Sequence, residues 1–183
     1  SRAVGLARDD NDNAAAGLPT DALALGEGKL TLHTGRYYFS NARALGRAHL
    51  VVDGNVTIHV DGDVESVGSA NVELAPGAAC DLYVNGSVHY AGSVVVGNAQ
   101  DPSAFRLYVG GTDSVIAGAG EATFYGFVYA PDAEVSWAGD TKIVGAILSR
   151  DLSYAVSLTV AYAKPSPRIE IAKPSVQDPG APS

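Results

Sequence analysis

The stretch "VTIHVDGDV", residues 56–64, contains the pattern that decides the fold. Apolar residues at positions 56, 58 and 60 alternate with polar residues at 57, 59 and 61, which is the period of a strand with one buried face. Gly62 then lies between Asp61 and Asp63, and Gly, Asn and Asp adopt the left-handed backbone of tight corners at low cost. The stretch therefore predicts a short strand that ends in a corner.

Related strands recur along the chain. The phrase apolar-x-Val-(Asp/Asn/Gly)-Gly begins at Leu50, Ile58, Leu82 and Leu107. Three of these phrases and three similar segments form one series, which predicts six strands that begin near residues 38, 58, 82, 107, 127 and 147. Between them lies a second family of strand-like segments, "AHLVV", "ANVEL", "SVVVG", "EATFYG", "DTKIVG" and "AVSLTV".

A period of roughly 20 to 25 residues with two or three short strands is typical of one coil of a β-solenoid. Inward residues would stack on their equivalents one coil above and below, and outward residues would meet water. The sequence thus predicts an all-β protein, a single-stranded parallel β-helix of about six coils. A β-sandwich is the alternative, because it also has short alternating strands. Its hairpins would not need a repeated phrase at near-constant spacing.

Three zones are predicted along the chain. Residues 1–27 form a lead or cap that is rich in Ala, Asp and Gly, and residues 28–162 form the β-helix domain. Residues 163–183 form a tail with five prolines, which oppose helix and central strand because proline lacks a backbone donor. The tail contains "RIEI", which could pair as a short edge strand.

Composition excludes several classes of function. The net charge is −8 and the 12 Lys and Arg residues are scattered, whereas nucleic-acid binding needs clustered positive charge. No apolar run approaches the roughly 18 residues of a membrane-spanning helix. The single cysteine, Cys80, permits no internal disulfide and no paired zinc motif.

Four stretches of the chain form a recognisable set: Gly35-x-Tyr37-Tyr38-Phe39, "VTIHVDGDV" at 56–64, "GFVYAPDAEV" at 126–135 and "IVGAILSRDLS" at 143–153. Through them the chain resembles a family of bacterial surface domains of unassigned function that occurs in type IV pilus-associated proteins with a PilX-type N-terminus and in other cell-surface proteins. The resemblance covers roughly residues 28–162. The resemblance implies a β-helix and no established catalytic residues. Family members usually close with a His-Tyr-Asp-like end, whereas this chain has "VAYAK" at 160–164.

The acidic corner at Asp61, Asp63 and Glu65 is the metal-site candidate, because calcium binds several converging oxygens. The same corner holds Asp53 before Gly54 in the preceding phrase, and later phrases place Asn85 and Gly110 there. This interchange favours local hydrogen bonding over a ligand site. "DDNDN" at 9–13 resembles the start of a calcium loop. It lacks the expected glycine and the closing Glu, so a flexible acidic lead is predicted. No cofactor is predicted, and calcium is the candidate ion for the acidic corner.

No catalytic constellation is predicted, so the chain is expected not to be an enzyme. Asp132, Asp140 and Asp151 occur in successive late coils but at different phases of the repeat. No G-x-S-x-G motif is present. The four histidines, which lack close metal-ligand spacing, are expected to face solvent. Many β-helices bind or cleave polysaccharides, and a carbohydrate-binding or carbohydrate-cleaving β-helix is the alternative function.

Tyr83 and Tyr108 occupy the same position in successive phrases and are predicted to stack on adjacent coils. Such an outward aromatic ladder could contact a glycan or a protein partner, or it could only cover the sheet.

The expected function is a non-catalytic structural or adhesive module, extracellular or on the bacterial surface and associated with pili or filaments. The expected partners are further copies of the chain or other surface or pilus proteins, with a glycan as a further candidate. A solenoid leaves open strand edges at both ends. Head-to-tail self-assembly is therefore expected through the ends or the tail, with Arg168, Ile169, Glu170 and Ile171 as candidates for strand addition.

Overall fold

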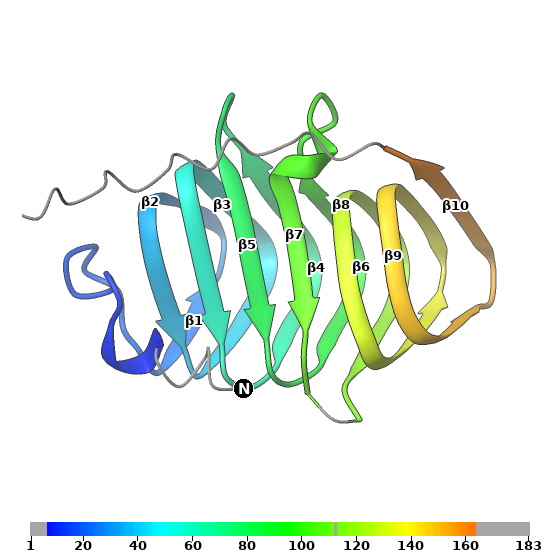
Figure 1. Cartoon of the computed structure of the whole chain (residues 1–183), viewed down its shortest axis with the longest axis horizontal. Helices are drawn as coiled ribbons and strands as arrows, with labels where there is room; N and C mark the ends of the chain where they lie inside the picture. The colour runs from blue at the N-terminus through cyan, green and yellow to red at the C-terminus, as the bar shows by residue number, and fades with distance from the viewer. Residues whose placement is uncertain (1–6, 112, 164–183) are drawn as a thin grey trace, which may run out of the picture.

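The computed structural model describes residues 7–111 and 113–163. They form a β-solenoid whose coils lie side by side along the long axis of the molecule (Figure 1). The strands are β1 (Ala22–Leu25), β2 (Gly28–Phe39), β3 (Asn41–Val60), β4 (Val64–Leu74), β5 (Ala79–Val84), β6 (Val88–Gly97), β7 (Phe105–Val109), β8 (Val115–Ala138), β9 (Asp140–Tyr154) and β10 (Ser157–Tyr162). A short 3-10 helix, η1 (Pro102–Ala104), precedes β7.

The strands stack into three faces, because the long strands bend around corners and continue on the next face. Face A consists of residues 22–25, 41–44, 64–67, 88–91, 116–119, 134–137 and 151–154. Face B consists of residues 28–33, 48–53, 70–74, 94–97, 122–125, 140–145 and 157–162. Face C consists of residues 35–39, 56–60, 80–84, 105–109, 127–130 and 146–149. The chain therefore makes about six turns.

Every strand pairing is parallel, so the β-helix prediction is confirmed and the β-sandwich alternative is wrong. The six predicted segments near 38, 58, 82, 107, 127 and 147 are the six strands of face C. The second family of segments forms face B. The solenoid begins at β1, ahead of the predicted domain boundary at residue 28, because β1 pairs with β3.

One phrase lies on a different face from the others. The phrase that starts at Leu50 belongs to face B, so Asp53 and Gly54 lie at the corner between faces B and C. The later phrases end at the corner between faces C and A. Asp53 is therefore not equivalent to Asp61, and it pairs instead with His33 at 3.2 Å on the preceding coil. Residues 50–54 on face B and residues 58–62 on face C share the phrase apolar-x-Val-Asp-Gly, which explains why the sequence alone made their corners look equivalent.

The core lies inside the three faces and consists of stacked inward residues. On face C, Ile58 pairs in register with Leu82, which pairs with Leu107 on the next coil. Val60 and Val84 are 1% exposed. Stacking of one apolar residue above another therefore lines the interior, in which a cavity of about 150 Å³ remains among residues that include Ile58, Leu82 and Leu107.

A column of glycines at the corner between faces A and B allows the coils to approach closely. The column contains Gly46, Gly68, Gly92, Gly120 and Gly139. Gly68 and Gly92 have φ values of 112° and 123°, in the region that favours glycine. A Cβ atom at Gly92 would lie 2.1 Å from the carbonyl oxygen of Gly68. A side chain at this corner would therefore force the coils apart.

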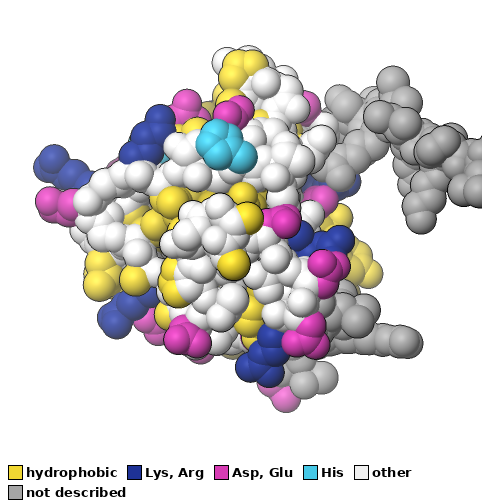
Figure 2. Space-filling view, turned by 90° about the vertical axis from the view of Figure 1, so that its left-hand side faces the viewer, with side chains coloured by type: hydrophobic (Ala, Val, Ile, Leu, Met, Phe, Trp, Pro, Cys, Tyr) yellow, Lys and Arg dark blue, Asp and Glu magenta, His cyan; other side chains and the backbone are white. Residues whose placement is uncertain are grey.

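The N-terminal end of the solenoid is covered. Figure 2 looks onto this end, where charged side chains lie mainly around the rim and hydrophobic side chains show only in small areas. Among the described residues up to Phe39, no large apolar side chain is exposed, and Leu32 and Phe39 are almost fully buried. Residues 7–21 contribute to this cover, because Leu18 packs against the core and Asn13 bonds to the backbone of Tyr38.

Gly92→Ala should destabilise the fold strongly, because the new methyl group meets the Gly68 carbonyl and the backbone is held at positive φ. The expected loss in the free energy of unfolding is about 2–4 kcal/mol in urea titrations. Gly26→Ala is the matched control, since its Cβ would meet no atom within 4 Å and its φ is not positive. Equal stabilities of the two variants would contradict the role of the glycine column.

Candidate functional site

An aromatic column runs along the outer side of face C. It consists of Tyr38, His59, Tyr83, Tyr108 and Tyr129, one residue from each successive coil. The rings of His59 and Tyr83 stack with centroids 5.0 Å apart, and those of Tyr83 and Tyr108 stack at 4.6 Å. The structure thus places Tyr83 and Tyr108 next to each other on adjacent coils.

The stacking limits what the aromatic column can bind. Tyr83 and Tyr108 are within 8° of parallel, so each covers a face of the other, whereas a sugar ring or a planar partner needs an open ring face. Tyr129 differs, because its ring is tilted by 58° from Tyr108 and 51% of the residue is exposed. A depression of about 270 Å³ lies here, and its walls include Asn85, Gly110 and Asp132. Most of the column therefore joins coils, and its end at Tyr129 offers an open aromatic surface.

His59 contradicts the expectation that the histidines face solvent. Its side chain points outward from face C, but the residue is only 6% exposed and its ring stacks on that of Tyr83. Its Nδ1 atom is buried, and no described residue forms a hydrogen bond with it. Burial lowers the pKa of His59, and the positive charge of Arg36 lowers it further. The surroundings of His59 in the aromatic column therefore favour its neutral form.

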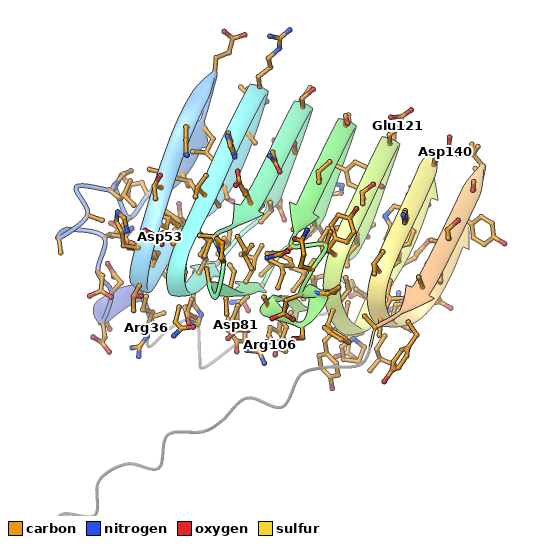
Figure 3. The ribbon with its side chains drawn as sticks, turned by 90° about the horizontal axis from the view of Figure 1, so that it is seen from above. Arg36, Asp53, Asp81, Arg106, Glu121 and Asp140 are labelled. Carbon is orange, nitrogen blue, oxygen red and sulfur yellow. The ribbon has the colours of Figure 1, made fainter. Side chains whose placement is uncertain are left out.

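An ion pair beside the aromatic column was missed by sequence reasoning. The guanidinium of Arg106 donates two hydrogen bonds to the carboxylate of Asp81, at 2.6 and 3.0 Å (Figure 3). Burial lowers the pKa of the Arg106 guanidinium, but hydrogen bonding to Asp81 and electrostatic attraction to Asp81, Tyr108 and Tyr83 together outweigh burial, so the pKa is raised. The signal was present in the repeat, because "DLYV" and "RLYV" place the two residues at the same phase. The ion pair therefore joins two adjacent coils through two hydrogen bonds.

The acidic candidates Asp61, Asp63 and Glu65 do not converge. Asp61 accepts hydrogen bonds from Asn85 at 2.9 Å and from the Tyr38 hydroxyl at 3.3 Å. Glu65 lies on face A and pairs with an arginine. Within residues 7–111 and 113–163, no group of three or more His, Cys, Asp or Glu residues is placed to hold a metal ion.

Asp63 belongs to a polar ladder at the corner between faces C and A. The Asn41 side chain accepts a hydrogen bond from the backbone N–H of Asp63 at 3.0 Å. The Asp63 carboxylate accepts one from the N–H of Ser87 at 2.7 Å. The Ser87 hydroxyl accepts one from the N–H of Val115 at 3.1 Å. Each corner side chain thus bonds to the next coil, which is a structural use of the acid.

The late acids do not share one wall. Asp132 and Asp151 lie at the corner between faces C and A, where Arg150 donates to the Asp151 carboxylate at 3.1 Å and to the Asp132 carbonyl at 3.0 Å. Asp140 lies elsewhere, because it begins face B. Asp140 lies beside Glu121 of the preceding coil at the start of face B (Figure 3). The enzyme-like alignment of these three acids on one wall is not present.

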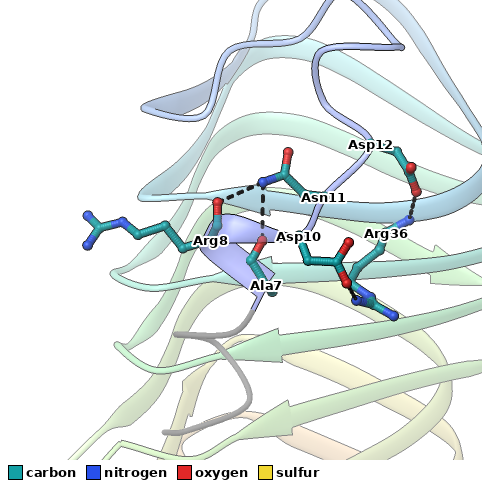
Figure 4. Close-up of polar contacts among 6 residues, drawn as sticks. All are labelled: Ala7, Arg8, Asp10, Asn11, Asp12 and Arg36. Atoms are coloured by element: carbon teal, nitrogen blue, oxygen red, sulfur yellow. Dashed lines mark hydrogen bonds and ion pairs between the residues drawn. The ribbon is translucent and has the colours of Figure 1, made fainter.

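The "DDNDN" segment forms an ordered part of the N-terminal cap, so the prediction of a flexible lead is wrong for it (Figure 4). Asp12 accepts a hydrogen bond from the N–H of Arg36 at 2.7 Å, and Asp10 pairs with the Arg36 guanidinium at 2.5 Å. Asn13 is fully buried and exchanges two hydrogen bonds with the backbone of Tyr38, at 2.7 and 2.9 Å. These contacts satisfy the free edge of face C, a long-range requirement that local composition does not reveal.

Two expectations concern other parts of the chain. The strand-addition candidates Arg168, Ile169, Glu170 and Ile171 lie outside the described residues. In the part of the chain that the structure describes, no helix has the length and hydropathy to cross a membrane.

Comparison with known proteins gives one family match. A family model described as a domain of unknown function (DUF7305) matches residues 1–165. No curated protein and no solved structure matches the chain. The match extends over the cap as well as the solenoid.

The pKa of His59 predicts a pH dependence of stability. Its folded-state pKa lies below the ordinary value of 6.5, so the unfolded chain binds more protons as the pH falls. The free energy of unfolding should therefore decrease as the pH falls below about 6.5. His59→Tyr, which extends the aromatic column, should remove this component. Urea titrations between pH 5 and 8 would measure it, and parallel pH profiles for wild type and variant would contradict the prediction.

Proposed function

Since the chain belongs to this family of domains of unknown function, whose match spans the cap and the solenoid, we propose that it is a non-catalytic structural or adhesive module. We place it outside the cell or on the bacterial surface, associated with pili or other filaments. Its partners would be surface or pilus proteins, including further copies of the chain.

The observation that carries this proposal is the use of the polar side chains. The side chains that sequence analysis suggested for chemistry are bound to neighbouring coils, as Asp63 is to Ser87 and Asp61 is to Asn85. The Asp81–Arg106 pair serves the same purpose. A rod of parallel strands with hydrogen bonds along its axis resists deformation and presents long side faces. Such a molecule suits a spacer or a display element.

The association with pili rests on sequence resemblance. The segment "GFVYAPDAEV" at 126–135, which resembles the pilus-associated surface domains, runs along face C, turns the corner that follows it and ends at the start of face A. Its Tyr129 is among the most exposed large hydrophobic residues that the structure describes. This face is therefore a reasonable place for a contact with a surface partner.

Contacts along the rod axis would involve the C-terminal end. The N-terminal end is covered by residues 7–21, so a simple head-to-tail stack of coil on coil would have to displace the cap. The last coil has no such cover among the described residues. We therefore propose that any axial contact uses the C-terminal coil and that other partners meet the side faces.

Immunogold labelling of intact cells of the source organism tests the proposal. Antibodies raised against the purified chain should label the cell surface and its filaments, because a structural surface module must be accessible there. The control is antiserum that has been absorbed with the purified chain. Label confined to the interior of permeabilised cells would refute the proposed location and function.

A glycan is the second candidate partner, and the open ring of Tyr129 is the observation in its favour. A sugar could stack on this ring while hydroxyl groups meet the carboxylate of Asp132 at the edge of the same depression. The stacked part of the aromatic column offers no comparable surface.

Tyr129→Ala should abolish any binding of the labelled protein to a panel of immobilised neutral and acidic polysaccharides, because it removes the stacking surface. Tyr125→Ala, which removes an aromatic side chain from the outer side of face B, should leave such binding unchanged. Wild-type protein that binds no member of the panel, or equal binding by both variants, would count against a glycan site at Tyr129.

A further inference from the structure

The hydrophobic core is open at the C-terminal end of the described solenoid. Leu152 and Tyr154 pair in register with Val135 and Trp137 of the preceding coil, which point into the core. Val135 and Trp137 are 0% and 5% exposed, whereas Leu152 and Tyr154 are 42% and 59% exposed. The terminal coil thus points apolar side chains inward, and no further layer of the described residues covers them.

Face B shows the same contrast. Val160 pairs with Ile143, which is 1% exposed, but Val160 itself is 48% exposed. Face C has one strand fewer than faces A and B. Its last strand, residues 146–149 of β9, pairs with β8 on one side, and no described residue pairs with its other edge. Exposed inward residues and a missing strand at one place indicate an incomplete coil.

The chain leaves the last coil at the position where that missing strand would begin. The N–H of Ala163 bonds to the carbonyl of Gly145, so Ala163 lies at the end of face B, and face C comes next. Two earlier coils insert a proline-containing corner between faces B and C, at residues 75–78 and 98–104. The sequence "AKPSP" at 163–167 has a similar length and composition.

We propose that "RIEI", residues 168–171, adds to the residue 146–149 edge of the same chain as a parallel strand that completes the terminal coil. The alternation places Ile169 over Ile147 with its side chain in the core, and Glu170 over Leu148 on the outside. Ile169 and Ile171 would then cover the open end of the core from the side that lacks a strand. The binding surface is the edge of β9, and its occupant is this segment.

Addition within one chain is favoured over addition to a neighbour. A corner of five residues, 163–167, lies between the lengths of the two earlier corners, so the segment can reach the edge without strain. A tether this short holds the strand at an effective concentration in the millimolar range, above that of a second molecule in solution. This inference does not depend on the proposed function, because it concerns only how the solenoid ends.

Disulfide trapping in the full chain tests the proposed register. In the variant Leu148→Cys, Glu170→Cys, the two cysteines would be directly opposite on neighbouring strands, at a distance that a disulfide can span. The control variant is Leu148→Cys, Ser175→Cys, which places the second thiol beyond the strand. The native Cys80 does not interfere, because it is buried and burial raises its pKa to about 12.

The Leu148–Glu170 cysteine pair should form an intramolecular disulfide at least about tenfold faster than the control, with the chain remaining a monomer in non-reducing electrophoresis. Equal rates for both pairs would overturn the proposed strand. Disulfide-linked dimers as the main product would show addition to a neighbouring chain and would overturn closure within one chain.

A stability measurement provides the second readout. The double variant Ile169→Asp, Ile171→Asp should lower the urea midpoint, because charged residues cannot cover the core. The control Ile169→Val, Ile171→Val should stay close to wild type. An unchanged midpoint in the aspartate variant would show that these residues do not cover the core, even if the cysteines cross-link.

Discussion

Close contact between successive coils is the constraint on which this structure depends. Every strand pairing is parallel, so each coil bonds to the next along the rod axis, and the chain must turn three corners within each coil. At the corner between faces A and B, only glycine allows one carbonyl group to lie against the next residue of the column, as at Gly68 and Gly92. The stacked core follows from this spacing, because each inward residue meets its equivalent directly above it.

The same contact between coils explains how many of the polar side chains are used. At the other corners, side chains of one coil bind the backbone of the next, as Asn41 and Asp63 do. On face C, the aromatic column and the Asp81–Arg106 pair link coils on the outside as the apolar residues do on the inside. These polar and aromatic side chains hold neighbouring coils together. The remaining surface of the side faces and the two ends of the solenoid are then the places where a partner could be recognised. The two ends differ, since the N-terminal end is covered and the C-terminal coil exposes its core.

Much of the fold could be predicted from local patterns. The six strands of face C and the strands of face B were found from alternation and spacing, because these signals repeat once per coil. Face A was not recognised as a separate stack, and the phrase at Leu50 was assigned to the wrong corner. The glycine column was also missed. The spacing of its glycines along the sequence varies with the length of the corners between coils, so they do not recur at a constant interval.

The sequence by itself determined the solenoid and its period, because alternation and corner residues act over a few positions and are repeated six times. It also determined that Tyr83 and Tyr108 share a phase. Only the tertiary structure decided that His59 is buried, that Asn13 caps the first coil and that Asp61, Asp63 and Glu65 do not converge. These outcomes depend on which residues of different coils lie side by side. That register is set by corner lengths and end contacts, which no local pattern contains.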